Sequence, residues 1–499
     1  MPGIRVTYSG LVSLVISLMS IFPSMIFMLI LTRMLSPEEF GTWGLIGGLI
    51  TYVVIVETIA SYWTTRETAR GIESGKTAVF SSGFFSIGGV IAYLTISYFV
   101  GGQTDANQDV LFFSAILIPV IFLNRILTAI NLGWKPHTVN IGVLSFAIAQ
   151  IPLAIIFLYF LHMGVIGVIL TVTAAYIINN IILIFYARDK LRNKIKVEFL
   201  KKWLRLFWLP LYPATTGMLI WLDVVIFSII TGSIVGLAFW TAAMFIPKII
   251  TNAGLVSSAV YPKLLQGGSR EHFQDNLTLL LYFAIPITAL AITFARPGLF
   301  ALNPLYEGVF PVVVILSIHM FFRTLSGVFQ LSLIGIEKVD VRKNSTFKDF
   351  FKSKLFFVPT IVLIQYAIYL ILLIIGLLLL LQLSTSQSDL LLFWAILGLT
   401  IQLPFTIYFF VLVRRNFPLK FDFSSIIKYL LISIGVFGMT YVLTEHFLIY
   451  KDSVFEFVPD LLLFVGTGIG SYMVISYFVD LRTRNLFKAI IRELKDAVK

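Results

Sequence analysis

The stretch LFFVPTIVLIQYAIYLILLIIGLLLLLQ (355–382) contains no Asp, Glu, Lys or Arg in 28 consecutive residues. About 20 apolar residues in a helix are enough to cross the roughly 30 Å hydrocarbon core of a bilayer. A soluble protein rarely buries so long an apolar helix in a single core. This segment therefore predicts a membrane-spanning helix.

The rest of the chain has the same character. Of its 499 residues, 58% are hydrophobic and 12% are charged, whereas soluble domains average about 45–50% and about 25%. Mean hydropathy is +0.95. This composition excludes a cytosolic enzyme, a secreted domain and a disordered scaffold. The chain has no cysteine, which excludes disulfides, thiolate metal sites and a cysteine nucleophile.

Fourteen apolar stretches are long enough to span, and the breaks between them carry polar turns such as SPEEFG (36–41), GGQTDANQD (101–109) and STSQSD (384–389). The first stretch is interpreted as a true helix, because no small-residue cleavage site separates it from the second. The predicted spans are 11–31, 42–64, 80–101, 110–130, 140–161, 165–187, 207–230, 237–260, 276–295, 310–334, 355–382, 390–413, 425–447 and 459–480.

The basic residues predict the orientation of these spans. With the N-terminus inside, 31 of the 37 Lys and Arg residues fall on the cytoplasmic side and three fall outside, namely Arg33, Arg296 and Lys451. Positive charge concentrates on cytoplasmic loops. We therefore expect a multi-pass protein of the plasma (inner) membrane with both termini cytoplasmic. The net charge of +12 is dispersed next to the spans, so it fits contact with anionic headgroups and not with nucleic acid.

The loops are too short for a soluble catalytic domain. The longest predicted loop has about twenty residues, and the sequence lacks a glycine-lysine phosphate loop, a His-Glu-x-x-His motif and an acidic metal cluster. The five histidines are scattered, and none is assigned a role. We expect no enzyme activity, no cofactor and no bound metal; a bundle of this kind is typical of transport.

An internal repeat divides the chain. Gly41 in LSPEEFGTWGLIGGL (35–49) and Gly236 in TGSIVGLAFWTAAMF (231–245) are 195 residues apart, and Arg125 in FLNRILTAI and Arg323 in MFFRTLSGVF are 198 apart. Arg66 and Pro262, at the cytoplasmic exits that follow, are separated by 196. Such internal symmetry is common in transporters.

The predicted fold is therefore an all-α integral membrane protein of about 14 transmembrane helices. Two six-helix lobes are related by a pseudo-two-fold axis along the membrane normal, and two C-terminal helices are added to them. The predicted parts are an N-terminal lobe (1–187), a basic cytoplasmic linker (188–206), a C-terminal lobe (207–413) and a last part with spans 13 and 14 and a basic tail (414–499).

Three stretches resemble one transporter family: LTRMLSPEEFGTWGLIGGLITYV (31–53), WLPLYPATTGMLIWLDVVIFSIITGSIVGLAFWTAA (208–243) and ALNPLYEGVFPVVVILSIHMFFRTLSGVFQLSLIGIEK (301–338). They resemble the polysaccharide transporter family (Wzx-type, O-antigen flippase) of the multidrug/oligosaccharidyl-lipid/polysaccharide exporter superfamily. The resemblance covers spans 1–12. In the second copy of the repeat the turn reads Gly-Leu-Ala-Phe, which differs from the pattern of the family. Fourteen spans resemble the branch that exports the peptidoglycan lipid precursor, where the extra pair forms a groove for a lipid tail.

A charge at the centre of a membrane helix costs about 2.5–3.5 kcal/mol on insertion scales, so it usually faces a cavity or a partner. Lys248 and Arg323 lie near the middle of spans 8 and 10, and Pro247 predicts a kink beside Lys248. These two cations are the predicted substrate-binding residues. Arg125, the repeat counterpart of Arg323, either joins them or extends toward the cytoplasmic interface.

Three further charged residues are placed by the pattern. Arg33 at the outer end of span 1 is predicted to anchor the interface or contact substrate at the outer mouth. Glu57 in span 2 and Asp223 in span 7 either pair with an arginine or take part in ion coupling.

The function implied is a flippase. It would move a polyprenyl-(pyro)phosphate-linked oligosaccharide to the outer leaflet by alternating access around a central cavity, for cell-surface polysaccharide or glycoprotein synthesis. The sugar is too polar to cross lipid unaided, and midplane cations suit an anionic linkage. With the inside negative, outward movement of one negative charge gains about 2.3 kcal/mol per 100 mV. Expected partners are this lipid-linked substrate, membrane lipids and glycosyltransferases of the same pathway.

Two alternatives stay open. A drug or cation antiporter of the same superfamily (MATE-like) would share twelve spans but favour acidic residues in its cavity. A membrane polymerase or glycosyltransferase would carry a long outer loop or a catalytic acidic pair, which this sequence lacks. The excess of basic over acidic residues near the midplane favours the flippase.

Overall fold

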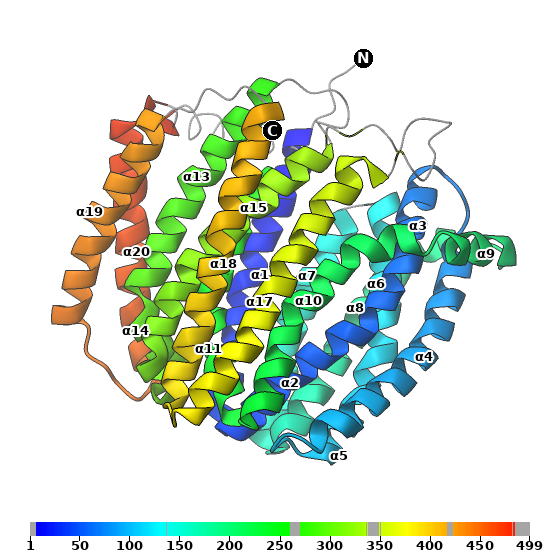
Figure 1. The fold of residues 1–499 in the computed structure, drawn as a ribbon, viewed down its shortest axis with the longest axis horizontal. Coiled ribbons are helices and arrows are strands. Elements are labelled where there is room, and N and C mark those ends of the chain that lie inside the picture. Colours follow the sequence, from blue (N-terminus) through cyan, green and yellow to red (C-terminus); the bar gives the residue numbers. More distant parts are fainter. Residues whose placement is uncertain are drawn as a thin grey trace. The chain divides into compact units, whose positions relative to one another are not determined.

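The computed structural model describes residues 6–135, 137–259, 270–335, 337, 349, 351–416, 423–481 and 483–484. Within these ranges every regular element is helical. Figure 1 shows the helices along the chain. Contacts divide the chain into two compact units. The first unit comprises residues 9–241 and 362–385, and the second unit comprises residues 1–8, 242–361 and 386–499.

The first unit holds the helices of the N-terminal half and most of one later helix. Its elements are α1 (Val6–Met34), α2 (Pro37–Val54), η1 (Ile55–Glu57), α3 (Thr58–Ala69), α4 (Gly75–Gly101), α5 (Gln108–Phe113), η2 (Ser114–Ile116), α6 (Leu117–Trp134), α7 (His137–Ala154), η3 (Ile155–Phe160), α8 (Gly164–Leu191), α9 (Val197–Arg205) and α10 (Trp208–Thr231), together with the first part of α11 (Ile234–Phe245) and most of α17 (Lys354–Gln382).

The second unit holds the remaining elements. They are η4 (Pro247–Ala259), α13 (Arg270–Thr293), α14 (Ala295–Leu302), η5 (Pro304–Val309), α15 (Phe310–Gly335), α18 (Gln387–Asn416), α19 (Phe423–Phe447) and α20 (Val454–Val479). The predicted lobes are units of symmetry, whereas these two units are defined by contacts. This division therefore does not test the predicted lobes, and the two-lobe repeat stays a prediction.

The predicted spans have clear counterparts among the described helices. Eleven helical segments are long and apolar enough to cross a membrane, and two bent helix pairs raise the number to 13. The helix α1 covers the remaining predicted span, although its shorter apolar part, Phe22–Met34, falls below that length. Much of this apolar surface is not covered by protein: in the most apolar stretch of α20 only 17% of the residues are buried. The chain is a multi-pass membrane protein.

Two predicted spans are broken rather than straight. The pair formed by α11 and η4 bends by 44° just before Pro247, which confirms the kink predicted there. The pair formed by α13 and α14 bends by 65° at Phe294, a break that the sequence analysis did not predict although Pro297 follows within one turn. The two breaks meet inside the second unit, because a methyl group on Gly298 would lie 2.9 Å from the Cδ1 atom of Ile246.

The polar turn at 36–41 forms because its residues satisfy the free amide groups at the start of α2. The Ser36 hydroxyl accepts from the Glu39 amide at 3.2 Å, and the Glu39 carboxylate accepts from the Ser36 amide at 3.1 Å. This reciprocal pair is a capping box, and Pro37 occupies the first helical position, where a missing amide donor costs nothing. The motif quoted in the family resemblance therefore has a local role in starting a helix.

Small residues let α2 approach α10 and the start of α11 closely. A methyl group on Gly41 would overlap the carbonyl oxygen of Ile234, and one on Gly44 would lie 2.6 Å from the Thr241 hydroxyl. Close approach of helix backbones at small residues is typical of helix packing in membranes. Gly41 thus contacts the segment that carries its predicted repeat counterpart, Gly236.

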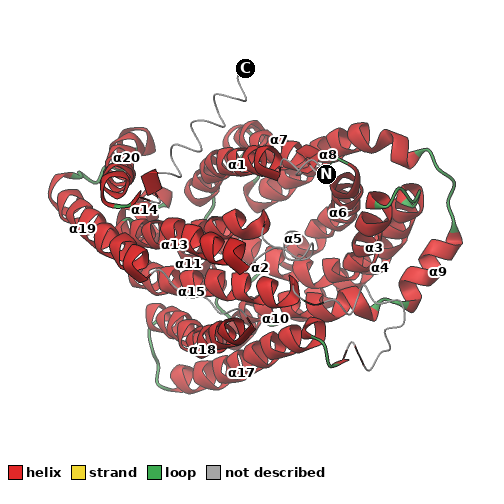
Figure 2. Ribbon diagram, turned by 90° about the horizontal axis from the view of Figure 1, so that it is seen from above, coloured by secondary structure: helices red, strands yellow, loops and turns green. Residues whose placement is uncertain are grey.

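The last two helices pack beside α13 and α14 in the second unit, where α19 and α20 lie side by side (Figures 1 and 2). The Tyr282 hydroxyl lies 3.2 Å from that of Ser476, and Thr293 donates to the carbonyl of Phe437 at 3.2 Å. A groove of about 480 Å³ runs between the two helices. It is lined by Ile432, Gly435, Val436, Met439, Thr440, Leu443, Thr467, Ser471 and Ile475.

Candidate functional site

The middle of α15 presents two basic side chains one helical turn apart, His319 and Arg323. Residues four apart lie on the same face of a helix. Arg323 is half-buried near the midpoint of this 26-residue helix, and it forms no ion pair with any residue that the structure describes. The Nδ1 atom of His319 is buried without a hydrogen-bond partner, and Arg323 acts on this imidazole electrostatically.

Lys248 is the second residue of η4, directly after the 44° break. Its side chain is exposed, whereas Ile250 on the same helix is fully buried against Ala291 and Met320. No acidic side chain pairs with Lys248 among the residues with described positions. The break also matters, because interrupted membrane helices expose backbone groups that often bind ions or substrate.

The second unit therefore carries two predicted cations on neighbouring elements, because η4 packs against α15. In the described part of these two elements neither cation has an acidic partner. A guanidinium, an ammonium and a free imidazole nitrogen can all donate to phosphate oxygens. This group of residues, Lys248, His319 and Arg323, is named the cation cluster.

The pattern of the sequence does not single out His319, because one histidine in an apolar helix is usually packed without a role. Only the position of His319 in the sequence indicates a role. Four residues separate it from Arg323, and this spacing places both side chains on one face of a helix. The unpartnered buried nitrogen is visible only in the structure.

Glu57 is the most deeply buried predicted acid. It ends the 3₁₀ turn η1 that interrupts the second span, its side chain is 0% exposed, and both carboxylate oxygens are buried without a hydrogen-bond partner. The charge of Arg125, on α6, and the nearby Ser61 hydroxyl both act on this carboxylate. A short 3₁₀ stretch inside a helix often marks a hinge, and a buried carboxylate without donors is stable only if it binds a proton or a cation.

Arg125 is exposed, so the side chain faces away from the packed interior of the first unit. Beside it, Asn124 donates to the side-chain oxygen of Asn180 at 2.9 Å, and Asn180 donates to the carbonyl of Val120 at 3.1 Å. These bonds hold α6 to α8. Tyr176 of α8 also experiences the charge of Arg125. The structure thus places Glu57, Arg125 and a polar contact between helices in one region of the first unit.

Asp223 has a different environment from Glu57. Its carboxylate accepts a hydrogen bond from the Tyr369 hydroxyl at 2.9 Å and another from the Val224 amide at 2.8 Å. These contacts link α10 to α17 within the first unit, and Asp223 also acts electrostatically on Tyr52. A tyrosine is therefore one partner of Asp223, and the expected arginine pairing or ion-coupling role stays a prediction.

Arg33 lies in the last turn of α1 with its side chain half-buried, at the helix end where an interface anchor is predicted. Among the described residues no group of three or more His, Cys, Asp or Glu side chains could hold a metal ion.

The sequence matches no protein-family model and no curated protein. Solved structures do match it. A structure of the lipid II flippase MurJ in an inward closed conformation aligns with a TM-score of 0.62 and 15% identity, over 95% of this chain and 99% of that one. An inward-facing MATE family multidrug transporter of the MOP superfamily gives 0.58 and 14%, over 81% of this chain and 98% of that one.

An outward-facing MATE family transporter of the same superfamily aligns with a TM-score of 0.51 and 15% identity, over 83% of this chain and 95% of that one. At these identities the likeness concerns the fold, and fold alone does not determine function. All three similar structures are of transporters. The chain therefore shares its all-helical fold with these membrane transporters.

Proposed function

We propose that the protein is a flippase that moves a polyprenyl-(pyro)phosphate-linked oligosaccharide from the cytoplasmic to the outer leaflet by alternating access, for the synthesis of cell-surface polysaccharide or glycoprotein. The observation that carries the proposal is Arg323. It is a half-buried arginine at the middle of a membrane helix without an acidic partner among the described residues. Such a charge is costly in a membrane unless an anion binds to it.

The cation cluster fits the anionic linkage of this substrate class. Arg323 offers a planar fork of donors that matches two phosphate oxygens, and Lys248 adds a point charge at a helix break. The free Nδ1 atom of His319 adds a third donor when it carries a proton. Arg125 remains a candidate for a second contact from the first unit.

The groove between α19 and α20 fits the other end of the substrate. Six of its nine lining residues are apolar, and at about 480 Å³ it has room for a segment of an isoprenoid or acyl chain. The match to the lipid flippase covers 95% of this chain, and the match to the MATE transporter covers 81%. The difference is roughly the length of one helical pair such as α19 and α20.

Glu57 is our candidate for ion coupling, because it is 0% exposed and neither carboxylate oxygen accepts a well-formed hydrogen bond, although the Ser61 hydroxyl lies nearby. Binding of a proton or a small cation would neutralise it, and the 3₁₀ turn beside it could change conformation in response. Asp223 is assigned a structural role instead, since Tyr369 and Val224 already donate to it. The same buried carboxylate is the observation that favours the alternative function, a MATE-like cation antiporter.

The test is flipping in proteoliposomes. The probe is a short polyprenyl-pyrophosphate-linked oligosaccharide with a fluorophore on the sugar, which an impermeant reductant bleaches only in the outer leaflet. Flipping by wild-type protein should fall to the protein-free background in the variant Lys248→Ala, Arg323→Ala. The matched control is Arg188→Gln, because the Arg188 side chain is 61% exposed and lies outside the cation cluster.

Two outcomes would overturn the proposal. Wild-type protein that flips the pyrophosphate-linked probe no faster than empty vesicles would exclude this substrate class, and full activity in the double variant would exclude the cation cluster. The antiporter is tested in parallel with vesicles that contain a lipophilic cationic dye under a proton or sodium gradient. Gradient-driven dye movement that survives Lys248→Ala, Arg323→Ala but is lost in Glu57→Gln would support the antiporter.

A further inference from the structure

The short helix α9 differs from its neighbours because it runs across the direction of the spanning helices, beside the ends of α3 and α4 (Figures 1 and 2). It joins the end of α8 at Leu191 to the start of α10 at Trp208, and both of those helices are long enough to span. We expect a short amphipathic helix held between two spanning segments to lie at the surface of the membrane. The spans on either side therefore fix its depth.

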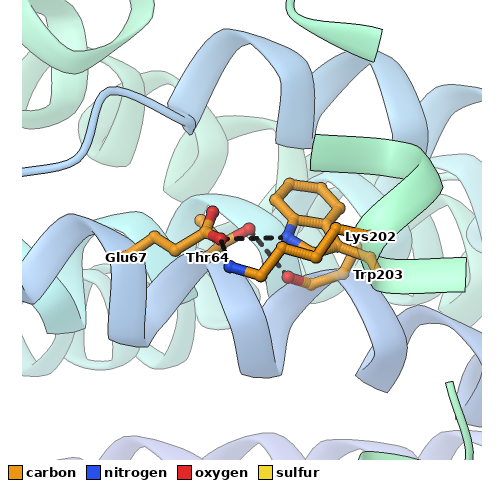
Figure 3. A network of polar contacts seen from close by, with 5 residues as sticks. Thr64, Glu67, Lys202 and Trp203 are labelled. Carbon is orange, nitrogen blue, oxygen red and sulfur yellow. Dashed lines mark hydrogen bonds and ion pairs between the residues drawn. The ribbon is translucent and has the colours of Figure 1, made fainter. Parts of the chain in front are cut away.

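A buried carboxylate holds α9 to α3. The Glu67 side chain is 2% exposed, and one of its oxygens accepts from the Lys202 ammonium at 3.0 Å and from the Trp203 indole at 3.4 Å (Figure 3). Trp203 is fully buried among Ile59, Ile126 and their neighbours. The carboxylate is buried although the Lys202 side chain is 49% exposed, so loss of Lys202 would leave a buried charge without its cation, which costs more than losing a surface pair.

A second attachment holds the chain that enters α9. The Lys196 amide donates to the Thr77 hydroxyl at 2.9 Å, and the Lys190 carbonyl oxygen lies so close to Gly75 that a methyl group there would be 2.5 Å away. Both contacts are to the first turn of α4. The helix α9 is thus fixed at its start and near its end, and only one of its faces is covered by the first unit.

The face of α9 that the first unit leaves uncovered is apolar, and a strip of charged side chains, here called the charged edge, runs beside it. At about 100° per residue, the apolar side chains of the helix occupy one half of its circumference and the charged ones the other half. Trp203 and half-buried Phe199 lie toward α3 and α4, but Val197 is 56% exposed and Leu204 is 45% exposed. Phe207, just after the helix, is 48% exposed.

Basic residues dominate the charged edge and the chain leading to it. Residues 188–205 contain eight Lys or Arg and two acidic residues. One of the eight, Lys202, pairs with Glu67, while Lys194, Lys201 and Arg205 are exposed without an ion pair among the described residues. Long basic side chains can keep their charge at the headgroups while their stems lie along apolar surface.

We propose that α9 and the segment before it form a docking surface for anionic phospholipid headgroups of the adjoining leaflet. Val197, Leu204 and Phe207 enter the boundary between headgroups and acyl chains, and Lys194, Lys201 and Arg205 bind the phosphates. Apolar residues beside a basic edge fit a lipid surface better than an acidic protein or a nucleic acid, which would leave the apolar face in water. This inference does not depend on the transported substrate.

The first test measures how deep α9 lies in the bilayer. It uses the protein reconstituted in nanodiscs of phosphatidylcholine with about one-third phosphatidylglycerol. Because the chain has no cysteine, Leu204→Cys and Glu198→Cys each place one environment-sensitive fluorophore on opposite faces of α9. The Leu204→Cys label should be quenched by lipids spin-labelled near the headgroup and protected from iodide. The Glu198→Cys label should show the reverse, and quenching of both labels by iodide alone would overturn the proposal.

Headgroup selectivity is the second test. At the Leu204→Cys label, spin-labelled phosphatidylglycerol should quench more strongly than spin-labelled phosphatidylcholine. Each neutralised cation should reduce that preference by up to about fivefold. The variant Lys194→Gln, Lys201→Gln, Arg205→Gln should abolish it, and the arginine variant Lys194→Arg, Lys201→Arg should retain it. Equal quenching by the two lipids in the wild-type background would overturn anionic selectivity, as would a preference unchanged by the Gln variant.

Discussion

Replacement of Gly41 by alanine tests whether the close approach in the first unit is essential to its packing. An alanine methyl group at this position would overlap the carbonyl oxygen of Ile234. A backbone carbonyl at the start of a helix cannot rotate away as the end of a flexible side chain can. The matched control is Gly47→Ala in the same helix, because a methyl group there would meet no atom within 4 Å.

The two variants share one effect and differ in another. Alanine in place of glycine inside a helix is worth about 0.5–1 kcal/mol of stability, and this gain applies at both positions. Overpacking applies only at Gly41 and typically costs about 1–3 kcal/mol. The difference between the variants is therefore the overpacking cost alone. We expect Gly41→Ala to be less stable than Gly47→Ala by about 1–3 kcal/mol, with a value near the upper limit because backbone atoms are involved.

The measurement is equilibrium unfolding of purified protein in mixed micelles, with sodium dodecyl sulfate as denaturant and helical circular dichroism as the signal. Both variants should insert and purify like the wild type, so the comparison rests on unfolding midpoints with similar slopes. Equal midpoints, or a higher midpoint for Gly41→Ala, would show that α2 and the start of α11 do not pack as closely as the structure places them.

The remaining predictions concern charge and topology. Arg323→Lys should keep part of the flipping rate and Arg323→Gln should lose it, because a point charge attracts phosphate without the bidentate geometry; initial rates in proteoliposomes decide this. Glu57→Gln should remove any dependence of transport on an ion gradient while transport down the substrate gradient continues. A double-mutant cycle of Asp223→Asn and Tyr369→Phe should give a coupling of about 1.5–3 kcal/mol in unfolding, as for other hydrogen bonds to charged groups; an additive result would contradict the bond. Single-cysteine labelling should find residues near 70, 195, 345 and 490 inside and residues near 105, 233, 386 and 453 outside, and two or more reversed positions would contradict the predicted topology.

The spans were predictable from the sequence because lipid imposes a simple rule. A segment of about 20 apolar residues in a bilayer has to satisfy its backbone hydrogen bonds as a helix. The Ser36 turn and the kink at Pro247 were predictable for similar local reasons, a capping side chain and a missing amide. Each of these features depends on residues within a few positions of one another.

Features that depend on distant contacts could not be predicted in this way. The basic segment 188–206 was predicted only as a linker, although it contains the nine-residue helix α9. Isolated helices of this length are marginal in water, so burial of Trp203 and the Glu67 attachment must stabilise it. The break at Phe294 has a local cause that was not used, because Pro297 lacks the amide that would donate to the Thr293 carbonyl. The unpartnered imidazole nitrogen of His319 became visible only with the packing around α15.

The charged residues inside the spans have different surroundings in the two units, and this difference affects the proposed mechanism. In the first unit the charge of Arg125 acts on buried Glu57, and Asp223 accepts a hydrogen bond from Tyr369. In the described part of the second unit, Lys248 and Arg323 have no acidic partner on any element. Uncompensated positive charge attracts an anion, while a buried acid near a cation responds to protons or small cations. Under the proposed function, substrate recognition therefore belongs to the second unit and the response to an ion gradient to the first, so variants of the cation cluster should alter substrate affinity and variants of Glu57 should alter coupling.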